Sequence, residues 1–313
     1  MTTAMKALSQ PKTWTWQYQG KSLKVCYETW GKAGRPLLML PALSTVSSRH
    51  ELGAIARFLT QSLNQDQPAP QRYQPIILDW PGFGDSDRPR LDYQPALYQQ
   101  LLQDFVRSQF GQPVAVMVAG HGAGYVMATA AAGLWSRIVL VAPTWRGPLA
   151  VMGAPKGLRK GVKNLVRTPL LGQALYGLNT QPGFLKWMYQ RHVFVEAATL
   201  TDDLLAQRHA STQQPGARYA PGAFVTGGLD PAQSREEFLG YFTGLDLPIL
   251  LLLAQQAPPS SKAEMEAMAQ QVSSSSTAQV RWLPGTLGMA EEFSEAVAQA
   301  IIPFLADRNS PPN

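Results

Sequence analysis

Short apolar segments alternate with helical segments along most of this chain. The strand candidates are the segments at 35–42, 75–80, 113–120, 136–143, 247–254 and 277–284. Segments with helical apolar spacing follow them, at 50–63, 95–110, 122–133, 231–242, 262–272 and 291–308. Strands and helices that alternate in this way build βαβ units, in which the strands lie parallel and the helices cover the sheet. We therefore predict an α/β fold with a mostly parallel central sheet.

Two regions depart from this alternation. Residues 13–19 and 24–30 alternate apolar and polar side chains around Gly20, which predicts an N-terminal hairpin. Residues 145–225 contain no convincing buried strand, only helical pieces with scattered Gly and Pro. We therefore divide the chain into a first core segment, an inserted helical cap and a second core segment, at 1–144, 145–225 and 226–313.

The composition is typical of a globular protein with a large core. Of the 313 residues, 45% are hydrophobic and 15% are charged, which suits one elaborated domain or a domain with an insertion. No stretch approaches the roughly 18 uninterrupted apolar residues of a membrane-spanning helix, and the N-terminal residues lack the apolar centre of a secretory signal. Cys26 is the only cysteine, so no disulfide can form within the chain. These features predict a cytoplasmic protein.

The net charge of +6 permits attraction to anionic surfaces. The sequence nevertheless has no zinc-finger spacing, no aromatic RNA-binding signature and no phosphate loop of the G-x-x-x-x-G-K type. His192 and His209 lie in the insertion with acidic residues between them, but their spacing matches no metal motif. We therefore expect no nucleic-acid partner, no metal and no cofactor.

Two motifs occur in order along the chain. LDWPGFGDSDRP at 78–89 contains Asp79 and Asp85, which are expected to fix this turn, and GHGAG at 120–124 lies between an apolar strand and a helix. The first motif resembles the D-x-P-G-x-G-x-S-x-x-P turn of the α/β-hydrolase superfamily, and the second resembles its G-x-nucleophile-x-G turn. This resemblance covers nearly the whole chain and implies an α/β-hydrolase fold with a helical cap. The phrases LPALSTVSSR, APTWRGPL and PGTLGMAEEF also resemble hydrolase-like proteins of cyanobacteria and chloroplasts.

The resemblance puts residues without suitable side chains at all three catalytic positions. Gly122 stands at the nucleophile position, Ala257 at the acid position, and Gly288, preceded by Leu287, at the histidine position. No histidine follows His209, so the usual base is missing in any alignment. Because acyl transfer needs a nucleophile, a base and a group that orients the base, the resemblance implies a triad-less, pseudohydrolase-like protein. Glycine adopts unusual dihedrals at little cost, so we expect a strained turn to be retained at Gly122.

Some groups near this turn remain candidates for binding or catalysis. By resemblance, the backbone N–H groups of Leu43 and Ala123 would form an oxyanion hole that could still hold a carbonyl or carboxylate oxygen. His121 is expected to pack under the turn. His50 is the candidate for a remaining base, although a place at the start of a helix is its simpler interpretation. The candidates for a displaced nucleophile are Ser44, Thr45, Ser47 and Ser48.

The insertion carries cations at helical spacing. They are Lys156, Arg159, Lys160, Lys163 and Arg167. A basic amphipathic helix can dock on anionic lipid, and the apolar, aromatic stretch at 170–194 would deepen contact with a bilayer, a partner or a greasy ligand. The simpler interpretation is a cap whose apolar side covers a pocket and whose basic side is solvated. Gly157 and Gly161 weaken the helix and favour this simpler interpretation.

Two functional hypotheses follow. The first is a catalytically degenerate α/β-hydrolase-fold protein that acts as a ligand-binding or scaffold protein. Its partner would be an apolar or lipid-like small molecule, another protein or an anionic membrane surface. The second is an enzyme of altered chemistry, a weak esterase or a lyase-like enzyme with non-standard catalytic residues. The protein is expected either free in the cytoplasm or peripheral to a membrane, which the cyanobacterial and chloroplast resemblance would make the thylakoid surface.

Overall fold

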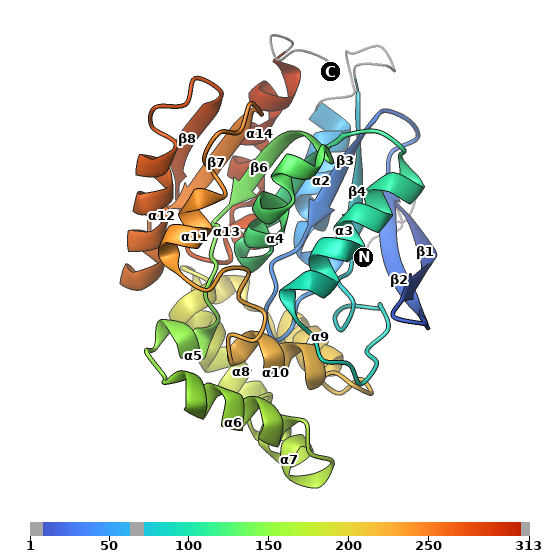
Figure 1. The fold of residues 1–313 in the computed structure, drawn as a ribbon, viewed down its shortest axis with the longest axis vertical. Coiled ribbons are helices and arrows are strands. Elements are labelled where there is room, and N and C mark those ends of the chain that lie inside the picture. The colour runs from blue at the N-terminus through green and yellow to red at the C-terminus, as the bar shows by residue number, and fades with distance from the viewer. Residues whose placement is uncertain (1–8, 63–71, 308–313) are drawn as a thin grey trace.

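The computed structural model describes residues 9–62 and 72–307, and an eight-stranded sheet forms the centre of this part (Figure 1). The strands are β1 (Ser9–Tyr18), β2 (Lys21–Trp30), β3 (Arg35–Leu40), β4 (Tyr73–Leu78), β5 (Val114–Ala119), β6 (Trp135–Val141), β7 (Ile249–Ala254) and β8 (Ala278–Leu283). Their order across the sheet is β1-β2-β4-β3-β5-β6-β7-β8. β1 and β2 form an antiparallel hairpin, β2 is antiparallel to β4, and the remaining neighbours are parallel. The predicted hairpin and the mostly parallel α/β sheet are confirmed.

Helices cover both faces of the sheet. They are α2 (Gly53–Ser62), α3 (Pro95–Gln109), α4 (Ala123–Ala128), α11 (Arg235–Gly240), α12 (Pro259–Gln271), α13 (Met289–Glu292) and α14 (Ser294–Ala306). α3 and α4 pack together on the face turned toward the viewer in Figure 1, and α2 packs against α14 on the other face. Every residue of β5 and of β7 is buried, as expected for parallel strands that are covered on both faces.

The insertion forms a helical layer beyond the sheet. Its helices are α5 (Pro148–Val151), α6 (Lys156–Val166), α7 (Leu170–Leu178), α8 (Pro182–Met188), the π-helix η5 (Tyr189–Val193), the 3-10 helix η6 (Ala197–Thr199), α9 (Asp202–Thr212) and α10 (Tyr219–Val225). Figure 1 shows α5, α6 and α7 below the sheet, with α6 and α7 furthest from it. Residues 145–225 contain no strand. The domain boundaries stay a prediction.

Two helices are shorter than predicted. α11 begins at Arg235, because Ser234 caps it by accepting a hydrogen bond from the N–H of Glu237 at 3.1 Å. α4 ends at Ala128, and only a short 3-10 helix, η4 (Ala130–Ala132), continues it. The N-terminal residues 1–8 and the predicted helix ends at 63 and 308 lie outside the described residues. Within 9–62 and 72–307, none of the helices combines the length and the apolar character needed to traverse a bilayer.

The parallel strands bring the predicted site together. Strands β3 to β8 run in one direction, so the loops that follow them lie at one edge of the sheet. The same edge faces the cap. Arg208 of the cap donates a hydrogen bond to Ser48 in the loop after β3, and the carbonyl of Val193 in the cap accepts one from Thr286 in the loop after β8. The loops after β5, β7 and β8 contain the three positions that the sequence singled out.

Candidate functional site

The turn after β5 contains the predicted nucleophile position. β5 leads into η3 (Gly120–Gly122), one turn of 3-10 helix, and α4 follows directly. Gly122 has ordinary helical dihedrals, with φ −61° and ψ −21°. The left-handed residue is Gly120, with φ 54°, where a Cβ would lie 2.9 Å from the Cβ of Ala42. The prediction of unusual dihedrals at Gly122 is therefore wrong, because the residue of this turn that adopts left-handed dihedrals is Gly120.

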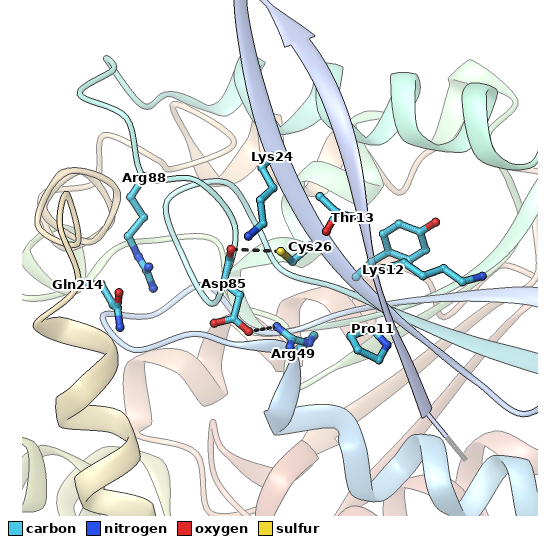
Figure 2. A pocket seen from close by; sticks show the side chains of 10 residues that line it. Pro11, Lys12, Thr13, Lys24, Cys26, Arg49, Asp85, Arg88 and Gln214 are labelled. Atoms are coloured by element: carbon cyan, nitrogen blue, oxygen red, sulfur yellow. Dashed lines mark hydrogen bonds and ion pairs between the residues drawn. The ribbon is translucent and has the colours of Figure 1, made fainter. Parts of the chain in front are cut away.

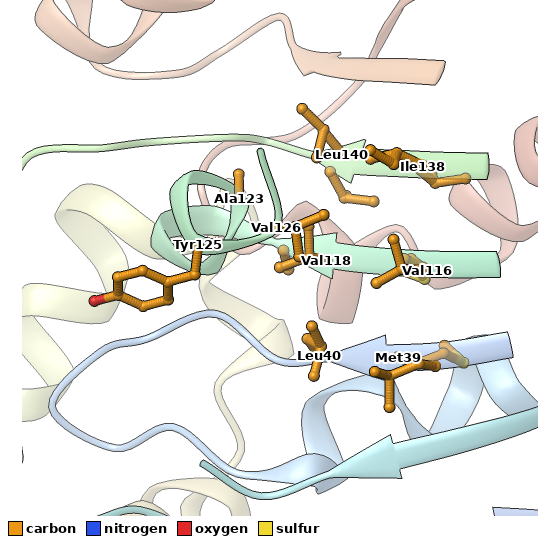
Figure 3. Packing of buried hydrophobic residues seen from close by; sticks show 14 of the residues in the cluster. Met39, Leu40, Val116, Val118, Ala123, Tyr125, Val126, Ile138 and Leu140 are labelled. Atoms are coloured by element: carbon orange, nitrogen blue, oxygen red, sulfur yellow. The ribbon is translucent and has the colours of Figure 1, made fainter. Parts of the chain in front are cut away.

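Apolar side chains fill the space beside Gly122. A Cβ at this position would lie 2.8 Å from Cγ2 of Val118 and 3.1 Å from Cζ2 of Trp80, with Cδ1 of Leu43 at 3.8 Å. Val118 and Trp80 are fully buried, and the indole N–H of Trp80 donates to the carbonyl of Pro41 at 2.8 Å. Figure 3 shows Val118 within the apolar layer between β5 and α4. The predicted nucleophile position is thus a packed part of the core.

Replacing Gly122 with alanine is expected to lower the free energy of unfolding by about 1–3 kcal/mol, the usual cost of adding a methyl group to a filled core. Val118 and Trp80 would have to move to admit the new Cβ. Chemical denaturation monitored by tryptophan fluorescence measures the effect. Gly161→Ala is the matched control, because nothing lies within 4 Å of its Cβ position, and it should leave stability unchanged or raise it. Equal stability of Gly122→Ala and the unaltered protein would contradict the packing described here.

The two predicted oxyanion donors differ in their hydrogen bonding. The N–H of Ala123 donates to the carbonyls of Gly120 and His121 within the turn. The N–H of Leu43 has no hydrogen-bond partner among residues 9–62 and 72–307. If a ligand oxygen accepted hydrogen bonds from both N–H groups, the N–H of Ala123 would have to give up its hydrogen bonds to the carbonyls of Gly120 and His121. The use of Leu43 and Ala123 as an oxyanion hole stays a prediction.

The loop after β7 contains Ala257 at the predicted acid position, and this residue is buried. Gln256, beside it, joins the loops after β7 and β8. Its backbone N–H donates to the carbonyl of Gly285 at 3.0 Å, and its side-chain oxygen accepts a hydrogen bond from the N–H of Gly285. Neutral amide groups therefore connect the two loops next to the position where the resemblance predicts a carboxylate.

The loop after β8 contains Gly288 at the predicted histidine position. Its N–H donates to the carbonyl of Val193 at 3.0 Å, and a Cβ would lie 2.5 Å from that oxygen. The hydroxyl of Thr286 donates to the same oxygen. Val193 belongs to η5 of the cap. The cap backbone therefore occupies the space that a side chain at position 288 would need.

His121 lies beneath the turn and is fully buried. Its Nε2–H donates to the carbonyl of Leu229 at 2.8 Å, and the hydroxyl of Tyr125 donates to the same oxygen at 2.6 Å. Burial lowers the pKa of His121 to about 4 and raises the pKa of Asp230, whose Oδ1 is 3.8 Å away, to about 7. The imidazole is therefore neutral at physiological pH and packs under the turn, as expected from the sequence.

His50 and the candidate hydroxyl groups do not form a catalytic pair. His50 is exposed at the start of η1 (Arg49–Leu52). Among the residues described, none of the four hydroxyl candidates hydrogen-bonds to a histidine. The hydroxyl of Ser48 accepts a hydrogen bond from Arg208 at 3.2 Å, and Ser47 is buried.

Asp79 and Asp85 bind Arg49 and fix the turn that contains them. The carboxylate of Asp79 accepts the N–H of Arg49 at 2.6 Å and the N–H of Asp85 at 2.9 Å. It also binds the guanidinium of Arg49, whose Nη1 lies 2.7 Å from Oδ2 of Asp85. A Cβ on Gly84, where φ is 52°, would lie 2.1 Å from this carboxylate. The expected structural role of both aspartates agrees with these contacts.

A second buried ion cluster, which the sequence did not reveal, joins the cap to the core. Arg208 of α9 lies 2.5 Å from Glu291 and 3.6 Å from Glu51, and it also binds Ser48. We call these four residues the Arg208 cluster. Burial raises the pKa of Glu51 to about 8. No local sequence pattern points to the cluster, because its members meet only through the fold.

One pocket lies beside the β1–β2 hairpin and has a volume of about 430 Å³. It is lined by Pro11, Lys12, Thr13, Lys24, Cys26, Tyr27, Arg49, Asp85, Arg88 and Gln214. Figure 2 shows the Arg49–Asp85 ion pair. It also shows the hydrogen bond that the thiol of Cys26 donates to the carbonyl of Asp85, with a length of 3.2 Å. This pocket is polar. Another pocket, of about 10 Å³, is lined by residues such as Ser47 and Gly82. Gly122 lines neither of these pockets.

Three of the five cations predicted for the cap helix pair with carboxylates of the protein. Lys163 and Arg167 lie 3.0 Å and 2.8 Å from Oδ1 of Asp92. Arg159 lies 3.9 Å from Asp230. These ion pairs connect the cap helix to carboxylates of the rest of the protein. Of the five predicted cations, Lys156 and Lys160 remain without an ion pair among the described residues.

Solved structures with the same fold have low sequence identity to this chain. Wild-type Cfl2 from Burkholderia cenocepacia is 16% identical, with a TM-score of 0.70 over 95% of this chain and 96% of that one. The haloalkane dehalogenase DatA from Agrobacterium tumefaciens C58 is 17% identical, with a TM-score of 0.68 over 94% and 96%. A thermophilic esterase from Thermogutta terrifontis is 19% identical, with a TM-score of 0.67 over 95% and 98%. At these identities the likeness concerns the fold.

No curated protein matches the chain in sequence. The model of the alpha/beta hydrolase family does match it, over residues 37–300. The matched range contains most of β3, all of β4 to β8, the cap and the three positions described above. The chain therefore belongs to the alpha/beta hydrolase family.

Proposed function

We propose that this chain is a catalytically degenerate member of its family that works as a binding or scaffold protein. The packing at Gly122 carries the proposal. A nucleophilic side chain at this position would meet Val118 and Trp80, which are fully buried. The contacts in the loops after β7 and β8 support the same conclusion for the acid and histidine positions. Loss of a whole triad costs on the order of a millionfold in turnover in a well-studied protease, so the remaining groups would support little hydrolysis.

The proposed partner is bound on the outer surface of the protein. A lipid-like small molecule would need an apolar cavity, and the pocket of about 430 Å³ is polar and lies beside the hairpin. An apolar ligand under the cap therefore has less support than a protein or a membrane surface. The phrases that resemble cyanobacterial and chloroplast hydrolase-like proteins belong to the proposal as well, and a thylakoid surface would be the corresponding membrane.

The purified chain is expected not to react with a fluorophosphonate probe and not to hydrolyse a panel of chromogenic esters. The physical reason is that no described hydroxyl near Gly122 has a histidine to take its proton. Mass spectrometry after labelling identifies any modified residue. His50→Ala is the matched variant, since it removes the candidate base at an exposed position.

The alternative function is a weak esterase or lyase-like enzyme with non-standard catalytic residues. It would be established by a label on one of the hydroxyl residues at 44–48, together with turnover that His50→Ala abolishes. Turnover that persists in His50→Ala would still contradict our proposal and would exclude His50 as the base. The absence of both label and turnover would support the proposed role.

A further inference from the structure

The outer side of α7 is apolar although it faces solvent. Leu170, Leu171 and Leu178 are 85%, 68% and 70% exposed. Their spacing puts them on one side of the helix, and we call them the α7 leucine face. α7 contains no charged residue. The surface of a protein seldom exposes several neighbouring leucines unless they contact a partner such as a protein, a membrane or a ligand.

Close packing fixes the orientation of α7. A Cβ on Gly172 would lie 2.2 Å from the carbonyl oxygen of Val166, at the end of α6. The ring of Tyr176 is buried on the same inner side. Rolling the helix to bury its leucines would break this contact between α6 and α7. The leucine face is therefore a stable feature of the cap surface.

Exposed cations accompany these leucines. Lys156 and Lys160 of α6 are exposed, and neither makes an ion pair with the described residues. No Asp or Glu occurs between Asp104 and Glu196, a range that includes all of α5 to α8. The outer part of the cap thus presents positive charge without any acidic residue of its own.

The position of α6 and α7 leaves them accessible to a large flat partner. Figure 1 shows both helices at the end of the molecule, beyond α5 and furthest from the sheet. Leu158 and Leu165 of α6 are also exposed. A planar surface could therefore touch both helices without meeting the core.

The residue types favour a lipid surface over a protein partner. Protein interfaces are enriched in aromatic residues and arginine and depleted in lysine, and leucine is under-represented at their hot spots. Helices that lie in the membrane interface combine lysine and arginine with leucine and aromatic side chains. α6 and α7 expose mainly leucine and lysine.

We propose that the cap docks on an anionic lipid bilayer, with the α7 leucine face among the acyl chains and Lys156 and Lys160 at the lipid phosphates. The inference rests on the binding role proposed above and names its partner, an anionic bilayer. It does not depend on the proposed loss of catalysis, because docking uses no residue near Gly122. A failure to bind lipid would leave the fluorophosphonate result untouched.

Co-sedimentation of the full chain with vesicles tests the proposal. The protein is expected to bind vesicles of phosphatidylcholine mixed with phosphatidylglycerol, to bind less as salt is added, and to bind pure phosphatidylcholine weakly. The double variant Lys156→Gln/Lys160→Gln should lower the partition coefficient roughly twenty-five-fold, from about fivefold per lysine. Leu170→Gln/Leu171→Gln should lower it roughly tenfold, because the apolar contact is lost.

Matched variants separate docking from general charge and hydrophobicity. Lys21→Gln/Lys32→Gln removes the same charge from exposed positions near β2, and Val280→Gln removes an exposed apolar residue of β8. Both should bind as the unaltered protein does. The proposal is overturned if the unaltered protein ignores anionic vesicles, or if these controls lose binding as strongly as the cap variants. Concentration-dependent self-association that only the leucine variant abolishes, without vesicle binding, would also overturn it and would make this face a protein interface.

Discussion

Asp79→Asn is expected to lower the free energy of unfolding by about 3–5 kcal/mol, the cost of breaking a buried ion pair from one side. The side chain of Asp79 is fully buried, and its two oxygens accept bonds from the N–H groups of Arg49 and Asp85 and from the guanidinium of Arg49. An amide would turn N–H donors toward that guanidinium and would remove the charge that compensates it. Urea denaturation at neutral pH measures the loss.

Asp85→Asn is the matched control for this prediction. Asp85 contacts the same guanidinium at 2.7 Å, but its side chain is 62% exposed. The change in charge is the same as for Asp79→Asn, and exposed ion pairs contribute roughly 0–1 kcal/mol. A small loss in the control and a large loss in Asp79→Asn would assign the effect to burial. Similar losses in both would mean that Arg49 depends on total charge and not on the buried carboxylate.

The fold could be predicted because its strands are apolar runs between helices of clear periodicity. The segment at 247–254 became β7 (Ile249–Ala254) and the segment at 113–120 became β5 (Val114–Ala119), with differences only at the ends. Every residue of these strands is buried, and it is the short length of the runs, together with the Pro and Gly residues at their ends, that identifies them as strands and not as core helices. α11 was mispredicted at its start, where a side-chain cap decides the boundary and periodicity does not.

The place of Gly122 in the fold could be predicted, but the conformation of its turn could not. The sequence placed Gly122 in the turn between a strand and a helix, where the structure has it, but the left-handed backbone belongs to Gly120. Dihedrals in a turn depend on hydrogen bonds that a motif does not specify. The ion pairs of Lys163 and Arg167 with Asp92 could not be predicted either, because only the fold brings these distant parts of the chain together.

Arg208→Met is expected to lower the free energy of unfolding by about 3–5 kcal/mol and to loosen the cap. Arg208 is buried and binds Glu291 at 2.5 Å, with Glu51 at 3.6 Å. Burial raises the pKa of Glu51, and Glu291 is the nearer of the two carboxyl groups to the guanidinium. Methionine would leave both without a cationic partner. Denaturation measures the stability, and limited proteolysis measures the opening of the cap.

Arg235→Met provides the control, because Arg235 binds Glu264 at 3.0 Å in a pair that is partly exposed. It should lose less than about 1 kcal/mol and leave the rate of cleavage unchanged. The double variant Arg208→Met/Glu291→Gln separates charge from packing, because it removes the carboxylate together with its cation. It should be more stable than Arg208→Met alone. A double variant that is no more stable than Arg208→Met would show that the guanidinium holds the cap through packing, and the electrostatic account of the Arg208 cluster would fail.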